Sequence, residues 1–101
     1  MDRRDTINVP TATAAIDAND PKTYWNGVTV RAAEANTEPV YVSGDPNMKA
    51  GIGGGGFQLD PGKEWPPTNE TDPPMQLKQI YIAAVNPGQV VTFEAEDGSG
   101  T

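Results

Sequence analysis

The chain has 101 residues, the size of a single small domain, and its formal net charge is −7. An acidic surface repels phosphate backbones and anionic lipids, so we expect neither nucleic acid nor a membrane as a partner. The sequence contains no Cys and no His, which excludes disulfides, thiol catalysis, nucleophile–His dyads and the usual zinc sites.

Residues 1–23 are predicted to form an extended N-terminal arm. Their large apolar side chains are Ile7, Val9 and Ile16, and the turn-forming segment Asp17–Pro21 follows. The first residues are charged and precede no apolar core, so we do not expect a signal peptide. Three interpretations remain open, namely a frayed tail, an edge strand, and an arm that becomes ordered on a neighbouring subunit.

Residues 24–96 are predicted to form a β domain. In Tyr24–Ala33 apolar residues recur at every second position, which is typical of a half-buried strand. A helix over Arg31–Ala35 is the alternative, because Ala and Glu favour helices. Five residues are too few for a stable isolated helix, so we expect a strand.

A pair of strands is expected over Pro39–Ser43 and Phe57–Leu59, followed by a tight turn at Asp60–Gly62. The loop between them, Gly44–Gly56, is rich in glycine. No Lys-Ser/Thr pair and no amphipathic helix follow it, so it lacks the features of a phosphate-binding loop. We expect it to be a mobile loop or a spacer where backbones approach closely.

The second half of the β domain is expected to begin with an edge strand at Lys63–Pro67 and a polar loop at Thr68–Pro74. Met75–Val85 has two largely apolar faces, which predicts a central strand. Gln89–Glu96 alternates between apolar and polar residues. The turn Asn86–Gly88 between the last two strands predicts an antiparallel hairpin.

Residues 97–101 are expected to form a polar C-terminal tail. The complete pattern predicts five to seven short strands separated by turns. The expected fold class is therefore all-β, a small antiparallel β-sandwich or a partly open barrel with an extended N-terminal arm.

Carboxylates are the remaining candidates for chemistry. Glu94 and Glu96 share one face of a strand, whereas glycoside hydrolysis needs two acids that face each other across a cleft. Asp45 and Asn47 lack the spacing and the closing acid of a calcium loop, and turn formation explains them. We therefore predict no catalytic residue, no cofactor and no metal site, and a protein that is not an enzyme.

Aromatic and apolar side chains are the candidates for binding. Tyr24, Trp25 and Trp65 could cover an open end of the sandwich, anchor an interface or form a sugar-binding platform. Together with the apolar residues of the arm they define one candidate protein interface, which consists of Ile7, Val9, Ile16, Tyr24, Trp25 and Trp65.

Four segments carry a resemblance to a known group of proteins. They are Asn36–Gly44 (NTEPVYVSG), Gly56–Gly62 (GFQLDPG), Ile80–Ala84 (IYIAA) and Val90–Phe93 (VVTF). This pattern resembles small virion accessory proteins of tailed bacteriophages, of the capsid decoration (cement) or head-fibre type. The resemblance covers roughly residues 35–95 and consists of strand and turn signatures. The chain departs from the pattern at Ser43–Asp45 and in a longer segment at Glu64–Gln76.

The resemblance implies a non-enzymatic structural virion protein. Its function would be that of a capsid decoration protein, which binds the outer surface of the major capsid shell and stabilises it. The implied partners are the major capsid protein and further copies of the chain, with a trimer favoured. The implied location is the capsid surface of the virion, and the host cytoplasm during assembly.

The alternative function is a receptor- or glycan-binding module of a head fibre or tail assembly. In that case the loops Lys49–Gly56 and Glu64–Pro74 would carry the binding, and Trp65 would stack on the sugar.

Overall fold

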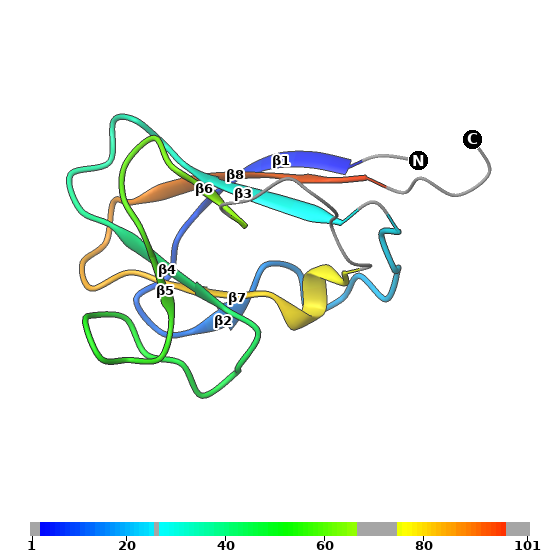
Figure 1. Cartoon of the computed structure of the whole chain (residues 1–101), viewed down its shortest axis with the longest axis horizontal. Helices are drawn as coiled ribbons and strands as arrows, with labels where there is room; N and C mark the ends of the chain where they lie inside the picture. Colours follow the sequence, from blue (N-terminus) through cyan, green and yellow to red (C-terminus); the bar gives the residue numbers. More distant parts are fainter. Residues whose placement is uncertain (1–2, 26, 67–74, 97–101) are drawn as a thin grey trace.

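The computed structural model describes residues 3–25, 27–66 and 75–96. This part of the chain forms eight β-strands and one short 3-10 helix (Figure 1). The elements in chain order are β1 (Arg3–Asn8), β2 (Ala14–Ala15), β3 (Val28–Ala32), β4 (Val40–Ser43), β5 (Phe57–Leu59), β6 (Glu64–Trp65), η1 (Leu77–Gln79), β7 (Tyr81–Ala83) and β8 (Val90–Ala95). The loop expected over Thr68–Pro74 and the tail expected over 97–101 lie outside the described residues.

The strands form two four-stranded antiparallel sheets, which Figure 1 shows as two layers. The strand order is β1-β8-β3-β6 in one sheet and β2-β7-β4-β5 in the other. The two sheets do not close into a barrel. The prediction of an all-β antiparallel sandwich is therefore confirmed.

The pairing of the strands follows a simple rule. The first strand pairs with the last, β2 with β7, β3 with β6, and β4 with β5. The chain thus forms one long antiparallel ribbon, and this ribbon rolls up so that β8 also pairs with β3 and β7 with β4. An eight-stranded, two-sheet arrangement of this kind is a jelly roll.

The core lies between the two sheets and follows the predicted alternation. On β8 the inward side chains are Val91, Phe93 and Ala95, and all three are buried. Val40 and Val42 of β4 belong to the same apolar cluster. A second, smaller cluster consists of Tyr41, Met48 and Ala83, with Ala50 and Tyr81 packed against it. The loop after β4 therefore covers the outer face of the β2-β7-β4-β5 sheet.

The segment expected to be an arm contributes a strand to each sheet. The six residues of β1 pair with β8 along their whole length, and β2 pairs with β7. Val9, which follows β1, is buried in the main core cluster. β1 and β2 are thus extended, but the chain bends between them, and both strands lie at the edges of their sheets. Of the interpretations left open for this segment, the structure corresponds to the edge strand.

Two sequence predictions in the last third of the chain were wrong. The strand expected over Met75–Val85 is interrupted by η1, and regular pairing is confined to β7. β-branched residues begin only at Ile80, and the preceding turn places Leu77 in the core. The hairpin expected at Asn86–Gly88 is also absent, because β7 and β8 belong to different sheets. Their apolar faces pack against each other across the core instead of lying side by side.

Candidate functional site

Within residues 3–25, 27–66 and 75–96, no group of three or more His, Cys, Asp or Glu side chains could hold a metal ion. Glu94 lies on the outer face of β8 and forms an ion pair with Arg4 at 2.9 Å.

Within the described residues, no helix has the length and apolar character needed to cross a membrane.

The six residues of the predicted interface occupy very different positions. Val9 and Tyr24 are buried in the core, while Ile7, Ile16 and Trp65 are half-buried and pack against it. These five side chains stabilise the sandwich and are largely unavailable to a partner. Trp25 differs from them because 56% of its surface is exposed. The structure therefore leaves Trp25 as the accessible member of the predicted set.

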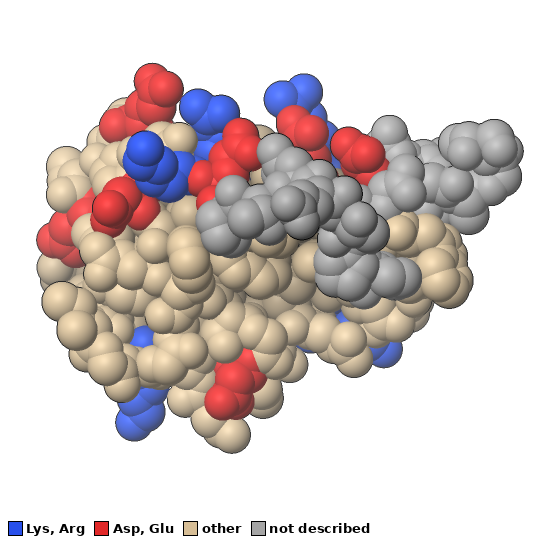
Figure 2. Space-filling model, viewed as in Figure 1, with Lys and Arg blue, Asp and Glu red and all other residues tan. Residues whose placement is uncertain are grey.

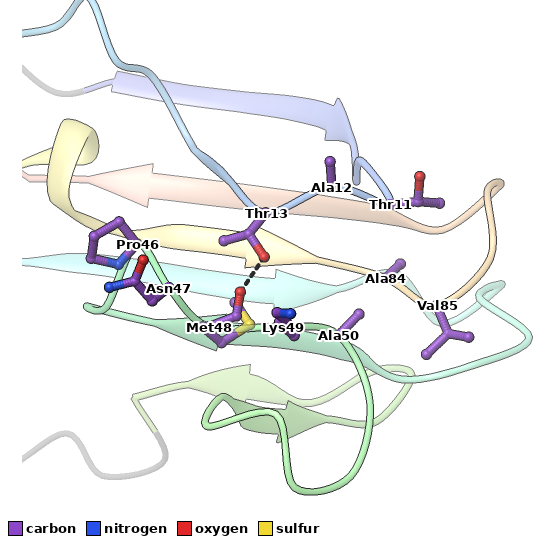
Figure 3. Close-up of a pocket in the computed structure, with 10 residues that line it drawn as sticks. All are labelled: Thr11, Ala12, Thr13, Pro46, Asn47, Met48, Lys49, Ala50, Ala84 and Val85. Carbon is purple, nitrogen blue, oxygen red and sulfur yellow. Dashed lines mark hydrogen bonds between the residues drawn. The ribbon is translucent and has the colours of Figure 1, made fainter.

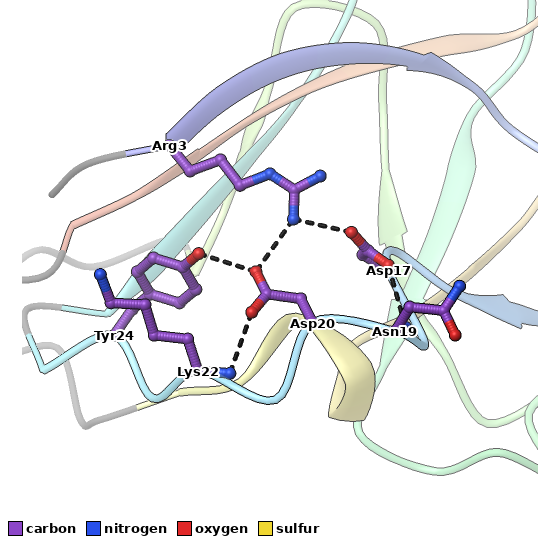
Figure 4. A network of polar contacts seen from close by, with 6 residues as sticks. All are labelled: Arg3, Asp17, Asn19, Asp20, Lys22 and Tyr24. Atoms are coloured by element: carbon purple, nitrogen blue, oxygen red, sulfur yellow. Dashed lines mark hydrogen bonds and ion pairs between the residues drawn. The ribbon is translucent and has the colours of Figure 1, made fainter.

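A polar network joins β1 to the turn that precedes Tyr24 (Figure 4). The Arg3 guanidinium donates hydrogen bonds to Asp17 at 2.7 Å and to Asp20 at 2.9 Å. The Tyr24 hydroxyl donates to Asp20 at 2.7 Å, and the backbone N–H of Lys22 donates to the other Asp20 oxygen. This Arg3 network therefore ties the beginning of β1 to the segment 17–24.

The network shifts the pKa values of its members. The hydrogen bond from Arg3 holds the pKa of Asp17 below its usual value. Burial opposes ionisation of Asp20, but hydrogen bonds from Tyr24, Lys22 and Arg3 outweigh it and lower the Asp20 pKa. Burial and the bond to Asp20 raise the pKa of Tyr24. Both carboxylates are therefore charged, and the phenol neutral, at neutral pH.

These shifts predict how stability depends on pH. Asp17 and Asp20 bind protons more weakly in the folded state than in the unfolded state. Their ionised forms therefore add to the free energy of unfolding above the unfolded-state pKa of about 3.9, and this addition is lost as pH falls through their folded-state pKa values. Tyr24 contributes below its unfolded pKa of about 10, and this contribution is lost as pH rises through the folded value. We expect urea denaturation to give a stability plateau between these limits.

The Arg3→Met variant tests this explanation. We expect its free energy of unfolding at pH 7 to be about 1–2 kcal/mol lower than that of the wild-type protein. The loss is modest because the Arg3 side chain is partly exposed and solvent screens its ion pairs. The difference in stability between the two proteins should shrink as pH falls below about 4 and through the lowered folded-state pKa values, since Asp17 and Asp20 then become protonated in both proteins. A loss that is independent of pH would contradict a role for the ion pairs.

The outer face of the β1-β8-β3-β6 sheet carries intermixed charges of both signs. Arg31 of β3 forms ion pairs with Glu64 of β6 at 3.1 Å and with Glu34 at 3.6 Å. Thr6 and Thr92 are joined by a hydrogen bond between neighbouring strands. Figure 2 shows acidic and basic groups side by side along this part of the molecule, whereas few charged groups appear on the opposite part.

The glycine-rich loop between β4 and β5 is folded back on itself. The Lys49 N–H donates to the Gly54 carbonyl at 2.9 Å, and the Gly54 N–H donates to the Gly51 carbonyl at 3.1 Å. A Cβ atom at Gly54 would lie only 2.0 Å from the Lys49 carbonyl oxygen. This glycine is therefore required by a close backbone approach, which agrees with the spacer interpretation of the loop.

An open groove of about 610 Å³ runs between this loop, the segment before β2 and the end of β7 (Figure 3). The Thr13 hydroxyl donates a hydrogen bond to the Met48 carbonyl and so joins two of its walls. The residues that line the groove are Thr11, Ala12, Thr13, Pro46, Asn47, Met48, Lys49, Ala50, Ala84 and Val85. Sequence reasoning missed it, because three segments that are distant in sequence form it and none of them carries a motif.

Segments that carry the family resemblance are joined to one another by hydrogen bonds. The Asn36 side chain accepts a hydrogen bond from the Val90 N–H and donates one to the Val90 carbonyl, both at 2.8 Å. The buried Gln89 side chain accepts from the N–H groups of Thr37 and Glu38. Hydrogen bonds of Asn36 and Thr37 therefore hold the connection between β3 and β4 against the beginning of β8.

The fold and the groove define a class, namely a small jelly-roll domain with a charged outer sheet. The groove lies on the other side, and its lining contains one lysine and no acidic residue. Comparison with family models, curated proteins and solved structures found no match for the chain. The class therefore rests on strand topology and on the residues themselves.

Proposed function

We propose that this protein is a non-enzymatic structural component of a tailed-phage virion, a capsid decoration protein that binds the outer surface of the major capsid shell and stabilises it. The observation that carries the proposal is the jelly-roll pairing of β1 with β8, β2 with β7, β3 with β6 and β4 with β5. Viral capsid domains are among the main users of this topology. Because one fold serves many functions, the topology supports the class and the residues must supply the rest.

The sequence supplies two further arguments. The strand and turn segments between residues 35 and 95 resemble phage virion accessory proteins. Jelly rolls also include the cupins and many lectins. A cupin-like metal centre normally uses histidine ligands, and this chain has none. A structural role on the virion surface needs no reacting group and is the most economical interpretation.

Trp25 is the side chain proposed to contact the capsid. It lies beside Tyr24, whose backbone N–H and C=O both bond to Met75, so the aromatic group is presented by a fixed end of the sandwich. Exposed tryptophans on rigid supports are common centres of binding energy in protein interfaces. A partner that covers Trp25 would also stabilise the folded chain.

The test uses the full chain and capsids that lack it. Removal of residues 1–20 is unsuitable, because it would also remove β1, β2 and the core residue Val9. We expect wild-type protein to sediment with capsids at high copy number and to raise their thermal stability. Trp25→Ala should weaken binding at least about 10-fold with an unchanged fold, whereas Phe57→Ala, which alters an aromatic residue elsewhere on the surface, should not. Absence of capsid binding by the wild-type protein would overturn the proposal.

A glycan- or receptor-binding module is the second candidate, because lectins share the jelly-roll topology. Trp65, the expected stacking residue, is half-buried and packs against the core. The groove beside the glycine loop has hydroxyl and amide groups but no aromatic side chain in its lining. This geometry offers little stacking surface for a sugar, so decoration is the better-supported proposal. Glycan binding that persists when capsid binding is absent would favour the alternative.

A further inference from the structure

Ile52 is the most exposed of the large apolar side chains that the structure describes, with 93% of its surface accessible. It lies at the tip of the glycine loop between Gly51 and Gly53, which have positive φ angles of 110° and 83°. The loop is not a free tether, because the hydrogen bonds of Lys49 and Gly54 close its base. Ile52 is therefore held outward by an ordered turn, and little conformational entropy would be lost on binding.

The groove described above begins directly beside this loop. A Cβ atom at Gly51 would lie 3.9 Å from the Val85 side chain, and Val85 is itself 54% exposed and lines the groove. Ala12 and Ala50 supply further apolar surface to the walls, whereas Ala84 at the bottom of the groove is buried. A projecting apolar side chain and a groove with partly apolar walls thus lie next to each other in one surface patch, which we call the Ile52 patch (Ile52, Val85, Ala12 and Ala50).

The Ile52 patch differs from the rest of the surface because it contains no acidic residue. The chain carries 14 acidic and 7 basic residues, yet Lys49 is the one charged residue among those that line the groove. Two copies with a net charge of −7 repel each other through most possible contacts. They approach with the least repulsion through a surface without carboxylates, and the Ile52 patch is such a surface.

We propose that two copies of this chain associate through the Ile52 patch, so that Ile52 of each copy enters the groove of the other. A projection and a groove in the same patch are self-complementary under a two-fold axis, and such a contact closes after two subunits. The expected assembly is therefore a dimer and not the trimer that the family resemblance implies. This contact does not depend on capsid binding.

Analytical ultracentrifugation of the full chain tests the proposal, over protein concentrations from about 1 μM to about 1 mM, the range of weak interfaces. We expect a monomer–dimer equilibrium for the wild-type protein. Ile52→Asp should weaken it at least about 100-fold, since the apolar contact of Ile52 is lost and a carboxylate is desolvated in the groove. Phe57→Asp is the matched control, because Phe57 is exposed outside the patch, and should leave dimerisation unchanged. Circular dichroism and thermal unfolding establish that each variant is folded.

A mixing experiment tests the proposed reciprocal contact. Ala12→Glu places a charge in the groove wall and should abolish dimerisation of that variant by itself. A mixture of Ile52→Asp and Ala12→Glu chains keeps one intact Ile52 and one intact groove, so we expect mixed dimers to form more readily than either variant alone. A wild-type monomer at all concentrations, a trimer, a dimer insensitive to Ile52→Asp, or no complementation in the mixture would each overturn the proposal.

Discussion

Replacement of Phe93 by alanine is expected to remove about 3–5 kcal/mol from the free energy of unfolding, the range measured for large aromatic residues in protein cores. Phe93 is the largest fully buried side chain in the described part of the chain. It lies on β8 between β1 and β3, and the Arg3 guanidinium stacks 5.4 Å from the centre of its ring. Small domains have a total stability of about 5–15 kcal/mol, so this one cavity could remove most of it.

Urea denaturation followed by tryptophan fluorescence measures this effect. Phe57→Ala provides the matched control, because the same atoms are deleted from a side chain that is 43% exposed. We expect the control to lose about 1 kcal/mol or less, as is usual for surface positions. Phe93→Leu should fall between the two, because leucine fills part of the cavity. Equal losses at positions 93 and 57 would contradict the assignment of Phe93 to the core.

Substitution of Asn36 is expected to have the second largest effect. Its side-chain amide pairs with both backbone groups of Val90 and extends the β-ladder where β8 begins. Asn36→Ala would leave the Val90 N–H without this acceptor in a partly buried position. We expect a loss of about 2–3 kcal/mol, because a buried polar group without a partner costs more than the hydrogen bond itself contributes. Urea denaturation at pH 7 provides the measurement.

Asn36→Asp gives a sharper test, because it removes the amide donor of Asn36 and keeps an oxygen acceptor in the same place. The new carboxylate can still accept from the Val90 N–H, but it faces the Val90 carbonyl oxygen without a proton to donate. This environment favours the neutral acid and raises the pKa of the new carboxyl group. The deficit relative to wild type should therefore be largest at neutral pH and should shrink as pH falls and the group is protonated.

Asn86→Ala is the control for both Asn36 variants. Its side-chain amide donates to the Glu38 carboxylate, but this bond is exposed to solvent. We expect a change of about 0.5 kcal/mol or less. A loss at Asn86 as large as that at Asn36 would mean that the backbone pairing of Asn36 has no special importance.

The positions of β4, β5 and β8 were predictable from local sequence. The alternation in Gln89–Glu96 identified β8 and its buried face, and Pro39–Ser43 and Phe57–Leu59 were correctly paired as neighbours. These predictions succeeded because the period of two reflects which face is buried, and this information is local. The tight turn at Asp60–Gly62 was also predictable, since Gly62 adopts a φ of 80°.

Long-range arrangement was not predictable in the same way. A short glycine turn between two strands normally indicates a hairpin, but Asn86–Gly88 carries the chain from one sheet to the other. The choice depends on partners far away in sequence, because β8 pairs with β1 and β3 and has no free edge for β7. The buried states of Val9 and Tyr24 depend on the same distant partners, so side chains predicted for an interface became part of the core.

The sequence by itself determined the fold class, the alternating strands and the absence of His and Cys chemistry, since composition and short-range periodicity are properties of the chain alone. Only the tertiary structure decided that β1 closes the sheet, that the Arg3 network fixes it, and that a groove lies beside Ile52. The physical reason is the same in each case. These features arise where segments distant in sequence bury apolar surface against one another, and no local pattern specifies which segments meet.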